Sequence, residues 1–192
     1  MSDQNTIQFG IGGGVRPSEA YGADYLSEMR RIIAAYTPDK ARTVLEWGMG
    51  NSTQFFIEER ETLGFGALFS IDNATDYFAA LRQTLPKWDG FHPFCIDLAG
   101  PKVSDRDPEL NFATFPLSIN ARFDIIFIDG RRRMECALTA ALLCHADTIV
   151  ILHDYRRARY QGVRLLFDIV EDGTQFRVMK LKPSLLAFRI AK

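Results

Sequence analysis

The chain has 192 residues, of which 47% are hydrophobic, and this length and composition predict a single globular domain with a sizeable core. Its net charge of −1 gives no general attraction to nucleic acid or to an anionic membrane, and no apolar run is long enough to span a bilayer. The polar start lacks a signal-peptide pattern, so we expect a cytoplasmic protein with reduced thiols. The three cysteines form no C-x-x-C pair, so we expect no cysteine-bound metal. From the charge and the short apolar runs we expect neither a nucleic-acid nor a membrane partner.

The first part of the chain predicts a lead-in, one helix and one strand. Residues 1–16 are glycine-rich, and we expect them to be a flexible lead-in to a single domain over residues 17–192. Apolar residues recur at helical spacing over residues 18–36, and Pro38 ends this helix. The apolar segment that follows, residues 43–46, predicts the first strand.

Strands and helices then alternate along the chain. The expected strands occupy residues 43–46, 67–71, 91–96, 123–128 and 148–152. The expected helices occupy residues 52–60, a segment that places Tyr77, Phe78, Leu81 and Leu85 inward, and residues 132–144 and 159–170. Residues 99–121 carry three prolines and little periodicity, so we expect an irregular, substrate-facing loop there. The alternation predicts an α/β protein with a doubly wound, mostly parallel sheet.

The end of the chain departs from that alternation. Residues 176–181 and 185–190 have the composition of two adjacent strands, joined at Lys182-Pro183-Ser184. Two consecutive strands predict a hairpin whose last strand is antiparallel to the rest of the sheet. A dinucleotide-binding fold would instead continue the alternation of strand and helix.

A glycine turn directly follows the first expected strand. The sequence Val44-Leu45-Glu46-Trp47-Gly48-Met49-Gly50-Asn51-Ser52-Thr53 runs from that strand through two glycines into a helix. Glycines let the backbone turn sharply and let a ligand approach, and the helix start offers unpaired N–H groups. Thr53 stands where the dinucleotide motif G-x-G-x-x-G has its third glycine, and Glu46 precedes the turn. An acid at that place suits a cationic ligand better than a pyrophosphate.

The pattern E-x-G-x-G-x-S, formed by Glu46, Gly48, Gly50 and Ser52, resembles motif I of the class I S-adenosylmethionine-dependent methyltransferases. The Rossmann-like sheet of that family also ends in an antiparallel hairpin, so the resemblance covers residues 40–192. The resemblance implies a class I methyltransferase fold, S-adenosylmethionine as the cofactor, and a small molecule as the substrate.

Each of the five expected parallel strands ends in an acid. These acids are Glu46, Asp72, Asp97, Asp129 and Asp154. Ligands of open α/β sheets bind at the carboxyl ends of the strands, so all five side chains are candidates for one site. Aspartate is also common at helix starts and in turns, and a capping role explains any single one of them equally well.

The resemblance implies cofactor contacts for three of these acids. Glu46 would lie near the methionine end of the cofactor, Asp72 would accept hydrogen bonds from the ribose hydroxyls, and Asp97 would lie near the adenine edge. Carboxylates suit these positions because they only accept hydrogen bonds, whereas ribose O–H and adenine amino groups donate them. Together with the glycine turn and Ser52, these acids form the expected cofactor site.

A second resemblance involves the last two parallel strands. Their ends, F-I-D-G at Asp129 and H-D-Y at Asp154, are similar to an O-methyltransferase-like subgroup of the class I family. Catechol-type relatives of this subgroup bind a divalent metal with acids at these two places, and carboxylates are suitable ligands for Mg²⁺. Those relatives have Asp-Asn where this chain has Asp154-Tyr155, and Arg131–Arg133 would repel a cation. A divalent metal therefore stays open, but we do not favour one.

The candidate catalytic residues are His153, Asp154 and Asp129. The ordinary pKa of histidine lies close to neutral pH, so His153 would suit a general base that takes a proton from a substrate hydroxyl. A histidine at a strand end that is hydrogen-bonded to a loop carbonyl explains the same residue equally well.

Two groups of arginines follow the last two parallel strands. Arg131, Arg132 and Arg133 follow the fourth strand, and Arg156, Arg157 and Arg159 follow the fifth. Because these strands are expected to be neighbours, both groups could border one cleft, and arginine forks match carboxylates and phosphates. We take Arg131, Arg132 and Arg156 as candidates for binding an anionic substrate. The alternative is a solvated face that is paired with nearby acids.

These observations favour a methyltransferase that acts on an oxygen atom of a small, anionic molecule. Three alternatives remain: a methyltransferase-like protein that binds a cofactor or partner without activity, a nicotinamide-dependent oxidoreductase, and a structural protein that has lost the cofactor pocket. The missing third glycine and the terminal hairpin argue against the oxidoreductase. Nothing in the sequence separates an active enzyme from a silent relative.

Overall fold

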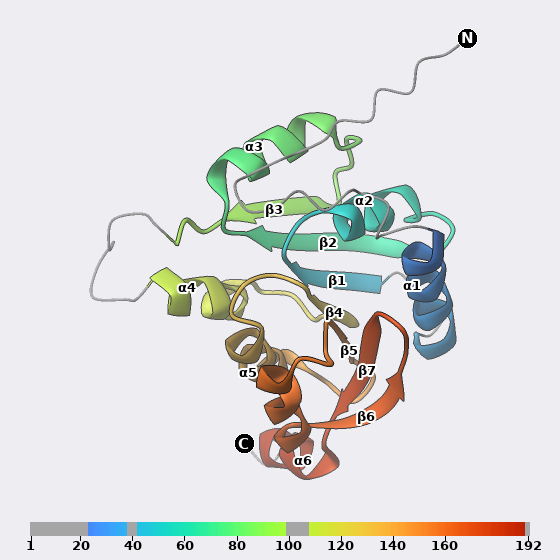
Figure 1. Ribbon diagram of the computed structural model, residues 1–192, viewed down its shortest axis with the longest axis vertical. Helices are drawn as coiled ribbons and strands as arrows, with labels where there is room; N and C mark the ends of the chain where they lie inside the picture. Colours follow the sequence, from blue (N-terminus) through green and yellow to red (C-terminus); the bar gives the residue numbers. More distant parts are fainter. Residues whose placement is uncertain (1–22, 38–41, 99–107, 191–192) are drawn as a thin grey trace.

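A seven-stranded sheet forms the centre of the molecule (Figure 1). The computed structural model describes residues 23–37, 42–98 and 108–190. The strands are β1 (Arg42–Trp47), β2 (Phe65–Asp72), β3 (Phe91–Cys95), β4 (Ile125–Ile128), β5 (Ile149–His153), β6 (Phe167–Asp172) and β7 (Phe176–Leu181). They lie in the order β3-β2-β1-β4-β5-β7-β6; β1 to β5 are parallel, and β7 runs antiparallel to both of its neighbours. The predicted α/β fold with a mostly parallel sheet and an antiparallel hairpin is therefore confirmed.

Helices cover both faces of this sheet. They are α1 (Ala23–Tyr36), α2 (Asn51–Glu58), α3 (Thr75–Thr84), α4 (Pro108–Thr114), α5 (Arg133–Leu143) and α6 (Pro183–Ile190), with 3-10 segments η2 (Phe115–Ser118) and η3 (Ala158–Leu165). α1 and α2 pack into one core and α4, α5 and η3 into the other. In β4, Ile125 and Phe127 face the first core while Ile126 and Ile128 face the second, as the two-residue period of a strand requires.

The terminal hairpin lies earlier in the chain than the sequence predicts. The helix expected over residues 159–170 is wrong, because η3 ends at Leu165 and β6 follows it. The strand expected over residues 185–190 is also wrong, because these residues belong to α6. Periodicity does not decide such short apolar segments: Phe167 and Ile169 alternate with exposed residues as in a strand, and Pro183 suits the first position of a helix.

The loop expected over residues 99–121 is helical where the structure describes it. α4 and η2 occupy residues 108–118, and the carbonyl oxygen of the buried Phe112 accepts a hydrogen bond from Nε1 of Trp47 at 3.2 Å. This bond joins α4 to the end of β1. Residues 119–121 are described and irregular, whereas residues 99–107, the expected lead-in over residues 1–16 and the expected helix end at Pro38 lie outside the described residues.

α1 is bound to the β6–β7 hairpin, which lies near the other end of the sequence. The Glu28 carboxylate accepts hydrogen bonds from the backbone N–H groups of Thr174 and Gln175, at 2.8 and 3.1 Å, in the turn between β6 and β7. Arg31 and Tyr36 both donate to the carboxylate of Glu171 in β6. The first helix that the structure describes is thus held by the last two strands.

Two sequence expectations about the general character of the protein can be compared with the structure. Within the described stretches, no helix combines the length and the apolar character needed to cross a membrane. All three cysteines are free thiols; Cys136 and Cys144 are buried and Cys95 is partly buried. This state agrees with the expectation of reduced cysteines in the core.

Candidate functional site

A cleft of about 1110 Å³ lies at the carboxyl ends of the parallel strands. It is lined by the turn between β1 and α2, the end of β2 and start of α3, the turn between β4 and α5, and η3, with Tyr25 of α1 at one side. Ligands of open α/β sheets bind in this position. The volume is slightly above the roughly 300–1,000 Å³ that is usual for a small-ligand pocket, which leaves room for two reactants side by side.

Gly48 allows two turns to pack against each other below this cleft. Its φ angle is +91°, which side chains rarely adopt, and a Cβ atom at this position would lie 2.6 Å from the backbone nitrogen of Gly130. Its N–H donates to the carbonyl of Ile71 at 2.8 Å, which links the turn to β2. Gly48 is therefore required by the backbone and by the neighbouring turn.

Gly50 serves a different purpose in the same turn. Its φ angle of 167° is extended backbone that any residue adopts, and it lines the cleft. A Cβ atom there would meet one described atom within 4 Å, the Tyr77 hydroxyl at 3.4 Å, which is an ordinary contact. The space above Gly50 is thus available to a ligand, next to the N–H groups at the start of α2.

Glu46 is fully buried beneath the glycine turn and does not line the cleft. Its carboxylate accepts hydrogen bonds from the hydroxyl groups of Ser52, Thr53 and Ser70, at 2.5, 2.7 and 2.6 Å. Burial raises the pKa of Glu46 to about 7, although the three hydroxyl donors act in the opposite direction. The structure therefore places Glu46 as a support that joins β1, β2 and the first turn of α2.

Asp72 lines the cleft and also shapes the loop around it. Its Oδ2 accepts from the N–H of Met49 at 2.9 Å, and its Oδ1 accepts from the N–H groups of Asn73 and Ala74 at 2.7 and 2.8 Å. A carboxylate has about four acceptor positions, so these three bonds leave about one for a ligand. Asp72 is thus both a turn-forming residue and a hydrogen-bond acceptor that faces the cleft.

Arg133 joins the ends of β4 and β5. Its guanidinium donates to Oδ1 of Asp129 at 2.7 Å and to the carbonyls of Gly130 and His153 at 3.1 and 2.7 Å, and it lies 3.3 Å from the Asp154 carboxylate. The Arg133 side chain is only 10% exposed. Asp129 and Asp154, the two acids proposed for metal binding or catalysis, therefore share one largely buried cation.

Of the three catalytic candidates, only Asp129 lines the cleft within the described part of the chain. His153 is buried, with Nδ1 at 2.8 Å from Oδ1 of Asp129 and its ring in edge contact with Tyr25. Asp154 adopts a left-handed conformation, with a φ angle of +58°, and pairs with Arg157 at 2.7 Å. His153 could therefore influence a ligand through Asp129 or Tyr25 rather than by direct contact.

We expect that removing divalent metal leaves ligand binding unchanged. The guanidinium of Arg133 already stands between Asp129 and Asp154, where a Mg²⁺ ion would need both carboxylates. The affinity for S-adenosylhomocysteine, measured by calorimetry, should be the same with and without EDTA. Loss of binding in EDTA and its recovery with Mg²⁺ would show that the two acids release Arg133 and bind the ion.

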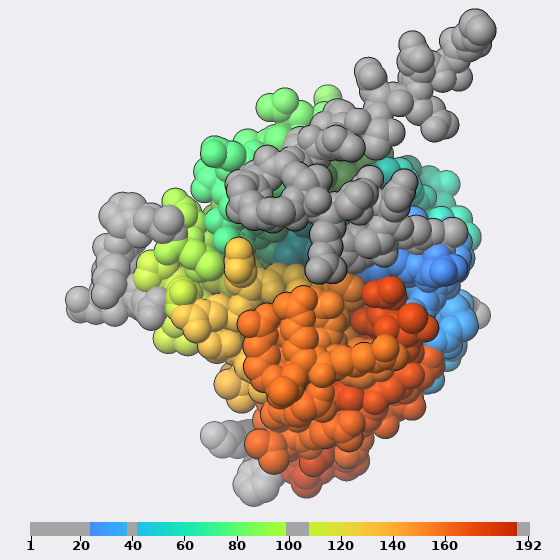
Figure 2. Space-filling view, viewed as in Figure 1, coloured from blue at the N-terminus to red at the C-terminus, as the bar shows by residue number. Residues whose placement is uncertain are grey.

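The structure separates the arginines that the sequence groups together. Arg131 and Arg132 line the cleft, but Arg156 does not, because its guanidinium donates to the Tyr155 hydroxyl and to the carbonyl of Gly173 on the outer side. The cleft instead contains Arg157 and Arg159 from the same segment, as well as Arg133. In Figure 2 the turn after β4, in yellow, borders the segment after β5, in orange.

Several residues of the cleft carry no sequence signal that distinguishes them from core residues. They include Tyr25, Met49, Tyr77 and Tyr160. The helical spacing of Tyr77 predicts an inward side chain, whereas in the structure its hydroxyl lies beside Gly50. Conversely, Asp97 is exposed and does not line the cleft; Leu98 does.

No protein-family model and no curated protein matches this sequence. Solved structures do match its fold. A mutant of the protein MtNAS gives a TM-score of 0.54 at 13% identity over 85% of this chain and 62% of that one, and the same mutant has been solved with S-adenosylmethionine. A Pseudomonas syringae protein assigned as a methyltransferase gives 0.52 at 16% identity, over 81% of this chain and 96% of that one.

A third match is the N-methyltransferase NodS from Bradyrhizobium japonicum, solved with S-adenosyl-L-homocysteine. Its TM-score is 0.52 at 12% identity, over 84% of this chain and 87% of that one. The chain thus has the class I methyltransferase fold that the resemblance implies, and it spans less than two thirds of the length of MtNAS. At these identities the likeness concerns the fold.

Proposed function

We propose that this chain binds S-adenosylmethionine and transfers its methyl group to an oxygen atom of a small molecule. The observation that supports this most strongly is the open space above Gly50, between the start of α2 and the Asp72 carboxylate. A methyl group on a positively charged sulfur is what the cofactor supplies when bound. The choice of an oxygen atom as the acceptor rests on the resemblance to the O-methyltransferase-like subgroup, whose F-I-D-G and H-D-Y sequences stand at the ends of β4 and β5.

In this proposal the chain binds the cofactor from two sides. N–H groups at the start of α2 and the free acceptor position of Asp72 receive the polar groups of the ligand, and Gly50 leaves room for it. Glu46 and Ser52 act mainly by holding the turn, since their side chains bind each other. Asp97 would contribute only at the rim.

Transfer to an oxygen atom requires that the acceptor hydroxyl lose its proton. Among the carboxylates that line the cleft we assign this role to Asp129, and the neighbouring His153 would hold it in place through the 2.8 Å contact between Nδ1 and Oδ1. Arg133 fixes the same carboxylate from the other side. His153 and Arg133 are therefore positioning residues, and Asp154 orients Arg133.

The sheet order argues against the oxidoreductase alternative. Dinucleotide-binding sheets of this kind have the order 3-2-1-4-5-6 without a reversed strand, whereas β7 is inserted antiparallel between β5 and β6 here. The alternative of an inactive binding protein is tested by turnover. Transfer of a labelled methyl group to small molecules would support the enzyme, while tight cofactor binding without transfer to any acceptor would favour a binding protein.

Replacement of Asp72 by alanine should weaken the binding of S-adenosylhomocysteine by roughly 1–3 kcal/mol, the usual effect of leaving a polar partner unpaired. Calorimetry on the purified protein measures this change. Asp72→Asn keeps one acceptor oxygen and should lose less. Asp76→Ala, which removes an exposed acid of α3 outside the cleft, is the matched control and should have no effect. Equal affinity in Asp72→Ala and the parent would limit Asp72 to its role in the turn.

A further inference from the structure

One wall of the cleft is strongly cationic. Among the residues that the structure describes, the basic ones that line the cleft come from the β4–α5 turn with the start of α5 and from the segment after β5 with the start of η3: Arg131, Arg132, Arg133, Arg157 and Arg159. The whole chain has a net charge of −1, so this concentration is local and does not reflect a basic protein. A patch of this kind attracts anions only where it is not neutralised by its own neighbours.

Three of these five arginines have acidic partners. Arg132 pairs with Glu109 and with Glu135, the latter at 3.3 Å. Arg133 pairs with Asp129 and Asp154, and Arg157 pairs with Asp154 at 2.7 Å. The acids close to this wall are thus already engaged by these three side chains.

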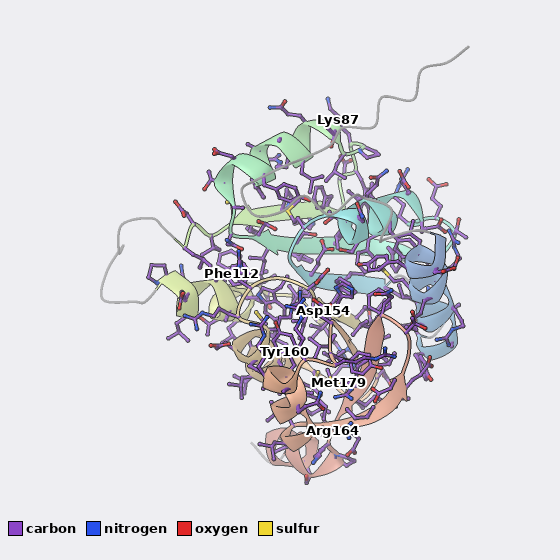
Figure 3. All side chains as sticks on the ribbon, viewed as in Figure 1. Lys87, Phe112, Asp154, Tyr160, Arg164 and Met179 are labelled. Carbon is purple, nitrogen blue, oxygen red and sulfur yellow. The ribbon has the colours of Figure 1, made fainter. Side chains whose placement is uncertain are left out.

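Arg131 and Arg159 are different. Neither forms an ion pair or a side-chain hydrogen bond with any of the residues that the structure describes. The guanidinium of Arg159 lies over the ring of Tyr160, 4.8 Å from its centroid, and both residues belong to η3; Figure 3 labels Tyr160. A ring face supports a guanidinium while leaving its N–H donors at the edge free for an anion. Both positive charges are therefore available to a ligand in the cleft.

The position of Arg131–Arg133 at the start of α5 also favours the binding of an anion. The N-terminus of a helix carries the positive end of the helix dipole, where acids stabilise and arginines do not. Arg132 also adopts a left-handed conformation there, with a φ angle of +50°. Local features that oppose stability in this way concentrate at functional sites. The N–H groups of the first turn of α5 add to the attraction for an anion.

We propose that Arg131 and Arg159, together with the start of α5, bind an oxyanion group of the methyl acceptor. The acceptor would then be a small molecule that carries a carboxylate or a phosphate. Guanidinium forks bind both groups through paired N–H donors, and the turn that contains Gly50 stays free for the cofactor. This inference deepens the proposed function and rests on it for the identity of the ligand as an acceptor. Arg156 takes no part, because it lies outside the cleft.

Inorganic phosphate and succinate are suitable probes of this site. Calorimetry should show binding of at least one of them to the parent protein, and the affinity should fall as salt is raised because part of the attraction is screened. Arg131→Ala and Arg159→Ala should each weaken that binding by about tenfold, the effect of losing a charge-assisted hydrogen bond. Arg164→Ala, which removes another exposed arginine of η3 that lies outside the cleft, is the matched control and should leave the binding unchanged.

Binding of S-adenosylhomocysteine to the same variants separates the two proposals. The double variant of Arg131 and Arg159 should lose the anion and keep this ligand. If the parent binds the anions but not S-adenosylhomocysteine, the anion site stands and the cofactor assignment fails. If the parent binds neither phosphate nor succinate, or the double variant binds them as well as the parent, the anion site is refuted. Stronger binding of a single-stranded oligonucleotide than of either probe would refute a small-molecule acceptor.

Discussion

Replacing Gly50 with valine should strongly weaken the binding of S-adenosylmethionine and of its demethylated product while the protein stays folded. The backbone at Gly50 is extended, so valine is compatible with it, and the new side chain would enter the cleft beside Tyr77. In the complex the valine side chain would occupy space that the ligand needs, and overpacking of this kind costs roughly 1–3 kcal/mol, so affinity should fall by about tenfold to a hundredfold. Calorimetry gives the affinity, and the thermal midpoint shows that the fold survives.

Gly48→Ala is the matched control, since the two glycines lie in one turn. Here the Cβ atom would meet the backbone of Gly130 and the φ angle is positive, so the fold itself should be destabilised by about 3 kcal/mol. Opposite effects of the two changes are therefore expected: lost binding at Gly50 and lost stability at Gly48. Unchanged affinity in Gly50→Val would remove the main support for a cofactor at this turn.

Replacing Arg133 with alanine should lower the free energy of unfolding by about 1.5–3 kcal/mol, the usual effect of losing hydrogen bonds to charged groups that are partly buried. The change leaves the carboxylates of Asp129 and Asp154 close together without their shared cation, and it leaves the carbonyl of His153 without its donor. Denaturant unfolding measures the loss. Arg132→Ala is the matched control, because its half-exposed pairs should contribute only about 0–1 kcal/mol.

The same variant offers a second measurement. Without the guanidinium, Asp129 and Asp154 become a pair of oxygen ligands, so Mg²⁺ should raise the thermal midpoint of Arg133→Ala more than that of the parent. Asn in place of Asp129 should cancel this response. A loss of stability in Arg133→Ala no greater than in Arg132→Ala would mean that the two acids are satisfied in some other way.

Much of the fold could be predicted because the strands are buried on both faces. β4 and β5 are continuous apolar runs between helices with clear helical spacing, and only a parallel sheet with helices on both sides accommodates them. The sequence also predicts a reversed strand at the end of the sheet. The antiparallel partner of β5 is indeed β7, residues 176–181.

The segments on either side of β7 could not be assigned in the same way. Residues 167–172 fit a helix by their apolar spacing and a strand by their alternation, and pairing with β7 decides in favour of the strand. Residues 185–190 are almost uniformly apolar, which fits a buried strand or a packed helix equally well. Tertiary contacts that the sequence pattern does not contain determine both outcomes.

The candidate site, like the fold, could be predicted only in part. The glycine turn, Asp72 and Asp129 could be located because they follow strands whose carboxyl ends meet at one edge of the sheet. Burial and side-chain direction could not be predicted from the sequence. In the structure Glu46 and His153 are buried beneath the cleft and Arg156 lies outside it. The binding roles of the residues that do line the cleft stay predictions.

The attachment of α1 to the hairpin has a consequence for how the protein is made. Glu28 binds residues that follow it by 146 and 147 positions, and β6 is connected to the rest of the sheet through β7. A ribosome therefore releases α1 long before its binding partners exist, although domains generally begin to fold from the N-terminus. α1 carries Tyr25 into the cleft, so the ligand site is completed only after nearly the whole chain has been synthesised. A truncated chain would expose the buried face of α1 rather than form a partial site.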